Sequence, residues 1–195
     1  KKHITNLKSF LNKKNFNFNN YQQIPNFITK ELLKDSIKLN YKQDQLLLDK
    51  LRLEFLTKHL DKKPKRIIEI GSNLGYFVLS LAKKYDSKII GYEPIKHYSQ
   101  ITKKLSKFIN LKKNIIIKNK SVKLYDIKKL LKTNLIIELN VLHHAGNYFD
   151  KDKVKKLGGW RNYALKRLSL LRTKADYLFF QTGNSGLEQH FKSVD

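Results

Sequence analysis

The chain of 195 residues is long enough for one domain with a buried core, and it contains no cysteine. The lack of cysteine excludes a disulfide framework and a thiolate metal site, and the six histidines are a poor substitute. The apolar runs are far shorter than the roughly 20 residues that a membrane span needs. We therefore expect a soluble, cytoplasmic protein with no membrane span and no bound metal.

The formal net charge of +25 would ordinarily indicate nucleic acid as a partner. Most of this excess is lysine, and asparagine and isoleucine are also abundant, as AT-rich coding would produce. Arginine is the residue suited to bidentate contacts with phosphate and guanine, and its scarcity argues against base reading. Solvated lysine faces are therefore favoured over a nucleic-acid surface, which remains the alternative. The arginines are Arg52, Arg66, Arg161, Arg167 and Arg172.

Residues 1–60 are predicted to form a helical lead-in that packs on the core. Residues 1–28 are polar, and a helical pattern begins near Lys30 and ends before Pro64. Because the sequence has no methionine, even at position 1, we expect either that it is not a complete natural open reading frame or that its start lies upstream. Helical spacing predicts one apolar face, made of Leu47, Leu48, Leu51, Phe55 and Leu56.

Residues 61–195 alternate between strand and helix patterns, which predicts βαβ units and right-handed crossovers. The fold class is α/β, a Rossmann-like, doubly wound and mostly parallel sheet with helices on both faces. No hairpin follows the fifth strand, so we expect the C-terminal strands of such a fold to be missing. Strands are expected at Arg66–Ile70, Lys88–Tyr92, Asn114–Lys118, Asn134–Leu139 and Ala175–Gln181, and helices at Tyr76–Tyr85, His97–Phe108, Tyr125–Leu131 and a stretch ending near Arg172.

The stretch "IIEIGSNLGYF" joins the first strand to the following helix through a glycine-bearing loop. In a doubly wound sheet, ligands bind beyond the carboxyl ends of the strands, where this loop lies. Gly71 permits a sharp turn and a close approach of backbone to ligand, and Gly75 opens the helix. A dinucleotide loop would need glycine at positions 71, 73 and 76, and a P-loop would need Gly-Lys-Ser/Thr. Neither phosphate motif fits.

The segment "EIGSNLG" resembles the first motif of class I S-adenosylmethionine-dependent methyltransferases, E/D-x-G-x-G-x-G. The resemblance extends over the order of elements from about residue 40 to 182, with Asn73 in place of the middle glycine. Asparagine adopts unusual backbone angles more readily than most residues. In "KIIGYEP", Glu93 stands where this family carries the acid that binds both ribose hydroxyls.

The resemblance implies S-adenosyl-L-methionine as the cofactor. Glu69 would orient the loop and the methionyl amino group, although an acid at this position can also be a helix cap. Tyr21, in "NYQQIP", matches a lead-in aromatic residue that closes over the cofactor in polysaccharide-terminating relatives, whose first helix "GFFSLSLA" is similar to "GYFVLSLA" here. The cofactor-binding residues implied are Glu69, Gly71, Ser72, Asn73, Gly75, Glu93, Asn140 and Tyr21, with Asn119, Lys120 and Ser121 flanking the adenine.

The stretch "LIIELNVLHHAGNYFD" contains the end of the fourth strand, whose carboxyl end abuts the transferable methyl group in the fold of this family. Methyl transfer from a sulfonium is an in-line displacement, so the protein aligns the reactants and removes a proton. Asn140 would contact cofactor or acceptor, and His143 or His144 would be the base, the alternative being a packing role. Trp160 is expected to anchor a loop or line the acceptor pocket, and Asn184 and Ser185 to reach the acceptor or form a turn.

These observations favour a methyltransferase with a small-molecule or glycan-type acceptor, methylating oxygen rather than nitrogen. Two alternatives stay open: an RNA methyltransferase that uses the basic surface, and a non-catalytic nucleotide-binding module with a degraded site. The Asn-Pro-Pro-Tyr signature of many amino-directed nucleic-acid methyltransferases is absent. The oligomeric state is not predicted.

Overall fold

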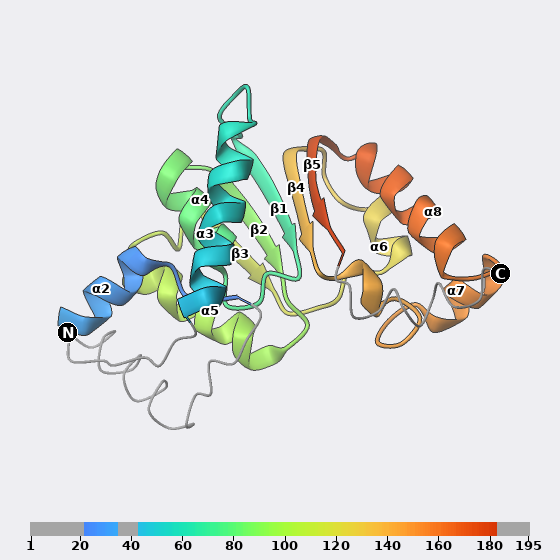
Figure 1. Ribbon diagram of the computed structural model, residues 1–195, viewed down its shortest axis with the longest axis horizontal. Coiled ribbons are helices and arrows are strands. Elements are labelled where there is room, and N and C mark those ends of the chain that lie inside the picture. The colour runs from blue at the N-terminus through green and yellow to red at the C-terminus, as the bar shows by residue number, and fades with distance from the viewer. Residues whose placement is uncertain (1–21, 35–42, 183–195) are drawn as a thin grey trace.

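The computed structural model describes residues 22–34 and 43–182. Two helices of the lead-in precede an alternation of strands and helices (Figure 1). The elements are α2 (Asn26–Lys34), α3 (Gln43–Lys58), β1 (Arg66–Ile70), α4 (Tyr76–Tyr85), β2 (Lys88–Tyr92), α5 (Lys96–Phe108), β3 (Ile115–Lys118), α6 (Leu124–Lys128), β4 (Thr133–Leu139), the 3₁₀ turn η1 (Leu142–His144), α7 (Lys151–Lys156), α8 (Trp160–Arg172) and β5 (Ala175–Gln181).

The strands form one sheet in the order β3-β2-β1-β4-β5, and every neighbouring pair is parallel. The order reverses between β1 and β4, so the carboxyl ends of these two strands open the crevice in which doubly wound sheets bind ligands. β-branched and apolar residues fill the central strands because both faces of a parallel sheet are covered. The predicted α/β, Rossmann-like fold is confirmed.

Helices cover both faces of the sheet, with α3, α4 and α5 on one side and α6, α7 and α8 on the other (Figure 1). One core cluster joins β-strand side chains such as Ile67 and Ile137 to Phe77 of α4 and Leu105 of α5. A second cluster joins Ile68 and other strand residues to α6 and α8. The sheet is therefore fixed from both faces, and its carboxyl edge is held rigidly for the site.

The lead-in packs on the first of these clusters. Ile24, just before α2, is fully buried there, as are Ile28 and Leu32, which lie four residues apart on one face of α2. The boundary near residue 60 that divides lead-in from core stays a prediction. No helix within the described ranges is long and apolar enough to cross a membrane.

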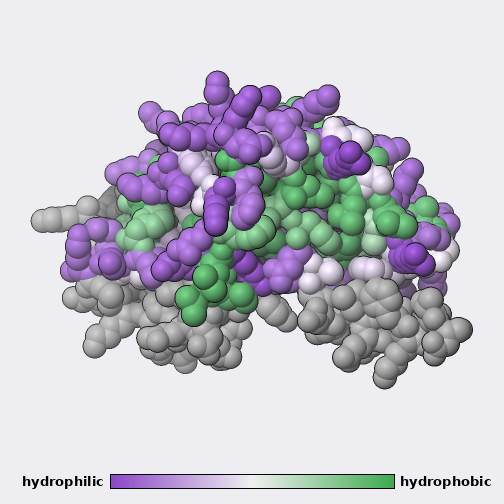
Figure 2. All heavy atoms as spheres, turned by 45° about the horizontal axis from the view of Figure 1, so that its top comes forward, coloured by the Kyte–Doolittle hydropathy of each residue, from purple (hydrophilic) through white to green (hydrophobic). Residues whose placement is uncertain are grey.

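The predicted apolar face of α3 is wrong. Leu47, Leu48, Leu51 and Phe55 are exposed, between 42% and 57%, and Leu56 alone of the five predicted residues is buried. The helix instead turns Asp49 and Leu56 inward, with Leu53 partly buried against the core. Leucines lie on several sides of this helix, so their spacing did not determine which side faces the sheet. Figure 2 shows hydrophobic side chains gathered at the surface in the middle of the face that it presents.

Other boundaries differ by small amounts. The helix expected at Tyr125–Leu131 is the single short helix α6, and the helical stretch expected before Arg172 is divided into η1, α7 and α8. Gly158 and Gly159 separate the last two helices with φ angles of 76° and 116°, in the left-handed region that interrupts a helix. Tyr21, Asn184 and Ser185 lie outside the described residues.

Candidate functional site

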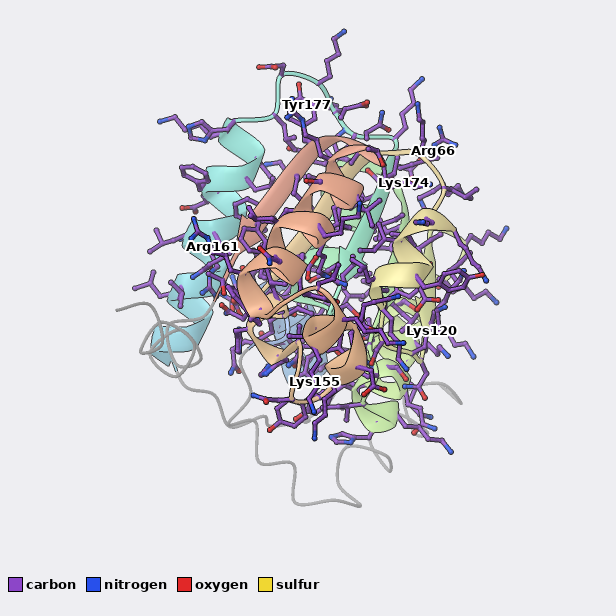
Figure 3. All side chains as sticks on the ribbon, turned by 90° about the vertical axis from the view of Figure 1, so that its right-hand side faces the viewer. Arg66, Lys120, Lys155, Arg161, Lys174 and Tyr177 are labelled. Atoms are coloured by element: carbon purple, nitrogen blue, oxygen red, sulfur yellow. The ribbon has the colours of Figure 1, made fainter. Side chains whose placement is uncertain are left out.

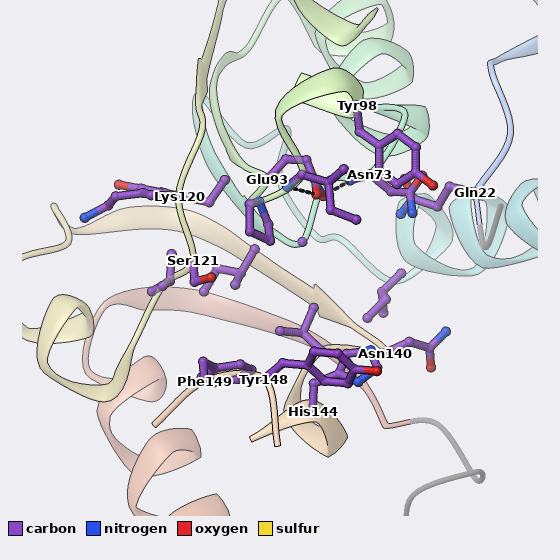
Figure 4. A pocket seen from close by; sticks show the side chains of 18 of the residues that line it. Gln22, Asn73, Glu93, Tyr98, Lys120, Ser121, Asn140, His144, Tyr148 and Phe149 are labelled. Carbon is purple, nitrogen blue, oxygen red and sulfur yellow. Dashed lines mark hydrogen bonds between the residues drawn. The ribbon is translucent and has the colours of Figure 1, made fainter. Parts of the chain in front are cut away.

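A cavity of about 710 Å³ opens at the carboxyl ends of β1, β2 and β4 (Figure 4). It is bounded by the glycine loop after β1, the turn after β2, the loop after β3 and the segment after β4, with lead-in residues closing one side. Eight predicted site residues line it. They are Gly71, Asn73, Glu93, Lys120, Ser121, Asn140, His143 and His144.

Gly71 makes the turn out of β1. Its φ of 76° is left-handed, and a Cβ at this position would collide with Cγ2 of Val141. Backbone N–H groups of Gly71 and Ser72 donate to the carbonyl of Tyr92, at 2.8 and 3.0 Å, and this ties the loop to the end of β2. A glycine is therefore required here by both backbone angle and space.

Asn73 and Glu93 hold the loop and the end of β2 together. Asn73 adopts a φ of 45°, and its backbone N–H donates to Oε2 of Glu93 at 2.7 Å. The other oxygen of Glu93 accepts from the backbone N–H of Ile95 at 2.8 Å (Figure 4). Glu93 is 4% exposed and faces the cavity, so its carboxylate is aimed by two backbone donors and keeps further acceptor capacity for a ligand.

Glu69 lies beneath the loop rather than in the cavity. Its Oε2 accepts from the backbone N–H of Val78 at 3.0 Å, and its Oε1 accepts from Nε2 of Gln22 at 3.3 Å. Burial raises the pKa of Glu69 to about 8, and the carboxylates of Asp49 and Glu93 contribute to the rise. The acid therefore connects the end of β1 to α4 and to the lead-in.

Ser72 and Gly75 do not line the cavity. The Ser72 side chain is fully buried, and its hydroxyl lies close to where a Cβ of Gly91 would be. Gly75 precedes α4 with a φ of 80° and packs against Thr102 of α5. Both residues therefore lie on the side of the loop that packs against the protein interior.

The loop after β3 contributes Lys120 and Ser121 to the cavity, beside Val122. Asn119 acts differently, since its Nδ2 donates to the carbonyls of Glu93 and Pro94 at 2.8 and 2.9 Å. It therefore fixes the turn that carries Glu93. These three residues were predicted together, and the structure separates them into two lining residues and one that holds the turn.

His143 and His144 lie on η1 at the edge of the cavity formed by β4. Their ring centroids are 3.9 Å apart, and the ring of Tyr148 meets His144 edge-on at 5.1 Å. Partial burial lowers the pKa of both imidazoles below its ordinary value, and His144 lowers that of His143 further. The shift favours the neutral form of both rings, the state in which an imidazole accepts a proton.

Asn140 lies just before them with a φ of 55°. Its backbone N–H donates to the carbonyl of Gln181 at 2.8 Å, so the ends of β4 and β5 are bonded where the lining segment begins. Tyr148, 83% exposed, stands at the opening of the cavity on the same side. This side therefore combines an amide, two imidazoles and an exposed aromatic ring (Figure 4).

The lining residues that were not predicted as site residues include Gln22, Arg52 and Tyr98. Arg52 lies on the inner side of α3 and pairs with buried Asp49 at 3.3 Å. Asp49 also accepts from the backbone N–H of Gln23 at 3.1 Å, which fastens the lead-in to α3. Arginine is rare in this sequence, which could have drawn attention to Arg52. Gln22 belongs to the segment "NYQQIP", which could have drawn attention to it.

A buried ion pair joins α8 to β4 next to the cavity. Nε of Arg167 on α8 donates to Oε1 of Glu138 on β4 at 2.8 Å, and NH1 donates to the carbonyl of Val122 at 2.9 Å. The guanidinium lies 5.4 Å from the ring centroid of Phe149, which lines the cavity. One side chain thus links three segments that border the site.

Of the two roles predicted for Trp160, anchoring a loop and lining the acceptor pocket, its contacts fit the first. Its Nε1 donates to the carbonyl of Leu142 at 3.3 Å, and it does not line the cavity. Within the described ranges there is no cluster of three or more potential metal ligands.

No protein-family model and no curated protein matches the sequence. Solved structures do match. The bifunctional kinase-methyltransferase WbdD superposes with a TM-score of 0.60 at 19% identity, over 94% of this chain and 38% of that one. A structure of monomeric WbdD gives 0.52 at 18% identity, over 86% and 37%. A SAM-dependent O-methyltransferase from Thermotoga maritima gives 0.49 at 14% identity, over 86% and 54%.

The chain has the fold of class I S-adenosylmethionine-dependent methyltransferases. It spans about two fifths of the length of the WbdD chains that it matches. Gly71, Asn73 and Glu93 line the cavity at the switch point between β1 and β4, the place where doubly wound sheets bind ligands.

Proposed function

We propose that this protein is an S-adenosylmethionine-dependent methyltransferase that methylates an oxygen atom of a small-molecule or glycan-type acceptor. The observation that carries the proposal is Glu93, buried at the end of β2, aimed into the cavity and held there by the glycine loop itself. A carboxylate in this position accepts hydrogen bonds from two ribose hydroxyls. The likeness of the fold to WbdD supports the same assignment.

The residues of the cavity fit this cofactor. Gly71 allows the sharp turn out of β1 that brings the loop backbone to the cavity, Glu93 suits the ribose, and Arg52 suits a carboxylate at the lead-in end. Ile95 and Val122 offer apolar contacts for a purine between the turn after β2 and the loop after β3. When bound, the sulfonium nucleoside supplies an activated methyl group.

The histidine side of the cavity is the proposed acceptor side. A neutral imidazole of His143 or His144 would accept the proton that a hydroxyl loses as it is methylated. Tyr148, exposed at the opening, offers a flat apolar surface against which a sugar or other ring can pack. Oxygen is favoured because a hydroxyl is a weak nucleophile until a base removes its proton, and a neutral imidazole can act as that base.

The acceptor is tested by methyl transfer from labelled S-adenosylmethionine to a panel of monosaccharides, oligosaccharides, phenols and RNA oligonucleotides. Transfer to hydroxyl compounds is expected. His143→Ala or His144→Ala should then lower kcat by about tenfold or more, while S-adenosylhomocysteine binds as before. If neither variant loses turnover, no histidine is the base; transfer only to RNA would contradict the proposed acceptor class.

The distribution of cations on the surface does not favour the RNA alternative. Figure 3 shows Arg66, Lys120, Lys155, Arg161 and Lys174 on different elements, spread over the face shown rather than gathered at one place. A spread of this kind is what solvated lysine faces produce. RNA retained at low salt and released at moderate salt, without regard to sequence, would reflect this charge alone.

A further inference from the structure

Gln22 brings an unsatisfied acceptor to the cavity. The residue precedes α2, is 6% exposed and lines the cavity near Asn73 and Tyr98 (Figure 4). Its Nε2 donates to Glu69, but its Oε1 is buried and accepts no hydrogen bond within the described part of the chain. Folded proteins seldom keep a buried acceptor without a donor, so a ligand that supplies one would remove a cost of folding.

Carboxyl groups surround this amide. Asp49, Glu69 and Glu93 are each at most 4% exposed, and they lie close enough that the first and last raise the pKa of Glu69. This is an unusual concentration of buried acids in a chain whose net charge is +25. Arg52 offsets Asp49 through their contact at 3.3 Å. A second cation held among these groups would favour the ionised forms of Glu69 and Glu93, whose pKa values are raised by burial.

The position of Gln22 is set by two separate elements. Its own amide is bonded to Glu69 on β1, and the adjacent backbone N–H of Gln23 donates to Asp49 on α3. The side chain therefore reaches the cavity in a fixed direction, without dependence on a mobile loop. Such preorganisation is what a specific polar contact to a ligand requires.

We infer that Oε1 of Gln22 accepts a hydrogen bond from the primary ammonium group of the methionyl end of the cofactor. This inference rests on the proposed function. An ammonium group has three donors and suits a site that combines a neutral amide oxygen with neighbouring carboxyls. Arg52 would form an ion pair with the adjacent carboxylate, so residues of the lead-in would contact both charged groups of the amino-acid end.

The test is calorimetric titration of the full chain with three ligands. These are S-adenosylhomocysteine, its deaminated analogue that keeps the carboxylate but lacks the ammonium, and 5′-methylthioadenosine, which lacks the whole amino-acid end. The unaltered protein should bind S-adenosylhomocysteine about tenfold or more tightly than the deaminated analogue. Equal affinities would overturn the inference without any variant having to fold.

Gln22→Met keeps the length and apolar stem of the side chain while removing the amide. It should weaken S-adenosylhomocysteine binding by about tenfold or more and leave 5′-methylthioadenosine within about twofold. The matched control is Gln23→Met, because this neighbouring glutamine is also buried but does not line the cavity; its affinities should be unchanged.

The failures of the two proposals are distinguishable. If Gln22→Met weakens all three ligands equally, Gln22 is a structural tie to Glu69 and the inference is overturned, while the cofactor assignment stands. If the unaltered protein binds none of the ligands, the proposed function fails and takes the inference with it. Thermal unfolding of each variant shows whether equal weakening comes from lost folding.

Discussion

Asn73 occupies a backbone position that most residues avoid. Its φ of 45° is left-handed, and its side-chain Oδ1 accepts from the backbone N–H of Leu74 at 2.8 Å. The left-handed region costs an ordinary residue about 1–2 kcal/mol, asparagine less, and glycine almost nothing. The backbone angle explains why asparagine can stand where the resembled motif has glycine.

Replacement of Asn73 should therefore follow backbone strain rather than side-chain chemistry. We expect Asn73→Gly to change the free energy of unfolding by less than about 0.5 kcal/mol, and Asn73→Ala to lower it by about 1 kcal/mol. Urea denaturation measures both. An alanine variant as stable as the glycine variant would show that the loop does not impose this conformation.

Glu69 should make stability fall as the pH rises. Its pKa is raised from 4.5 to about 8 in the folded protein, so between these values the unfolded chain releases a proton that the folded chain keeps. Glu69 alone should therefore lower the free energy of unfolding by up to about 1.4 kcal/mol per pH unit between these two pKa values. Below the lower value and above the higher one, its contribution should not change with pH. Urea denaturation of the unaltered protein and of Glu69→Gln from pH 4 to 9 isolates it. The variant should gain relative stability up to about pH 8; a constant difference would contradict the assignment.

The sequence predicted those site residues that directly follow a strand. Gly71, Asn73 and Glu93 follow strand ends, and parallel strands bring their carboxyl ends to one edge. Gln22, Arg52 and Tyr98 reach the same cavity only through the packing of α3, α5 and the lead-in. No periodicity in the sequence contains that information. For the same reason, Ser72 and Gly75 could be assigned to the loop but not to its outer or inner side.

The orientation of α3 is decided by its polar residues. Asp49 and Arg52 face inward because they hold Gln23 and line the cavity, and this turns several leucines outward. A helix with apolar residues on more than one side gives no unique prediction of its buried face. Here the contacts of the site override the leucine pattern.

Two leucines of α3 should differ sharply on replacement. Leu56 is 5% exposed and Leu51 is 52% exposed. Leu56→Ala should lower the free energy of unfolding by about 2–4 kcal/mol through a cavity in the core, and Leu51→Ala by less than about 1 kcal/mol. Chemical denaturation of the pair is a direct comparison. Equal losses would indicate that both leucines are buried, as the sequence predicts, and would contradict this orientation of α3.

Helix α8 is joined to β4 by a buried ion pair whose removal from one side should be costly. Arg167 and Glu138 are both fully buried, so Arg167→Ala leaves the carboxylate without its partner. We expect a loss of about 3–5 kcal/mol in the free energy of unfolding. The control is Arg161→Ala, an exposed arginine of the same helix, which should have little effect. Similar losses for both variants would mean that the ion pair does not hold α8.

For the whole molecule, alternation of strands and helices was sufficient to predict the sheet and its layers. Right-handed crossovers and burial of both faces leave few arrangements for five parallel strands. The division of the region before Arg172 into η1, α7 and α8 was not predicted, because it depends on left-handed residues such as Asp150 as well as on glycines. Asp150 is held by Tyr163 and by the backbone of Leu124, contacts that only the folded chain creates.

The central claim is that the cavity at the switch point of the sheet binds S-adenosylmethionine through Glu93. Calorimetric titration with S-adenosylhomocysteine measures this most directly, with Glu93→Ala compared against Glu54→Ala, an exposed acid on α3. Binding is expected for the unaltered protein and for Glu54→Ala, with a loss of about tenfold or more, or about 1.4 kcal/mol, for Glu93→Ala. No binding at millimolar ligand, or binding that Glu93→Ala leaves unchanged, would contradict it.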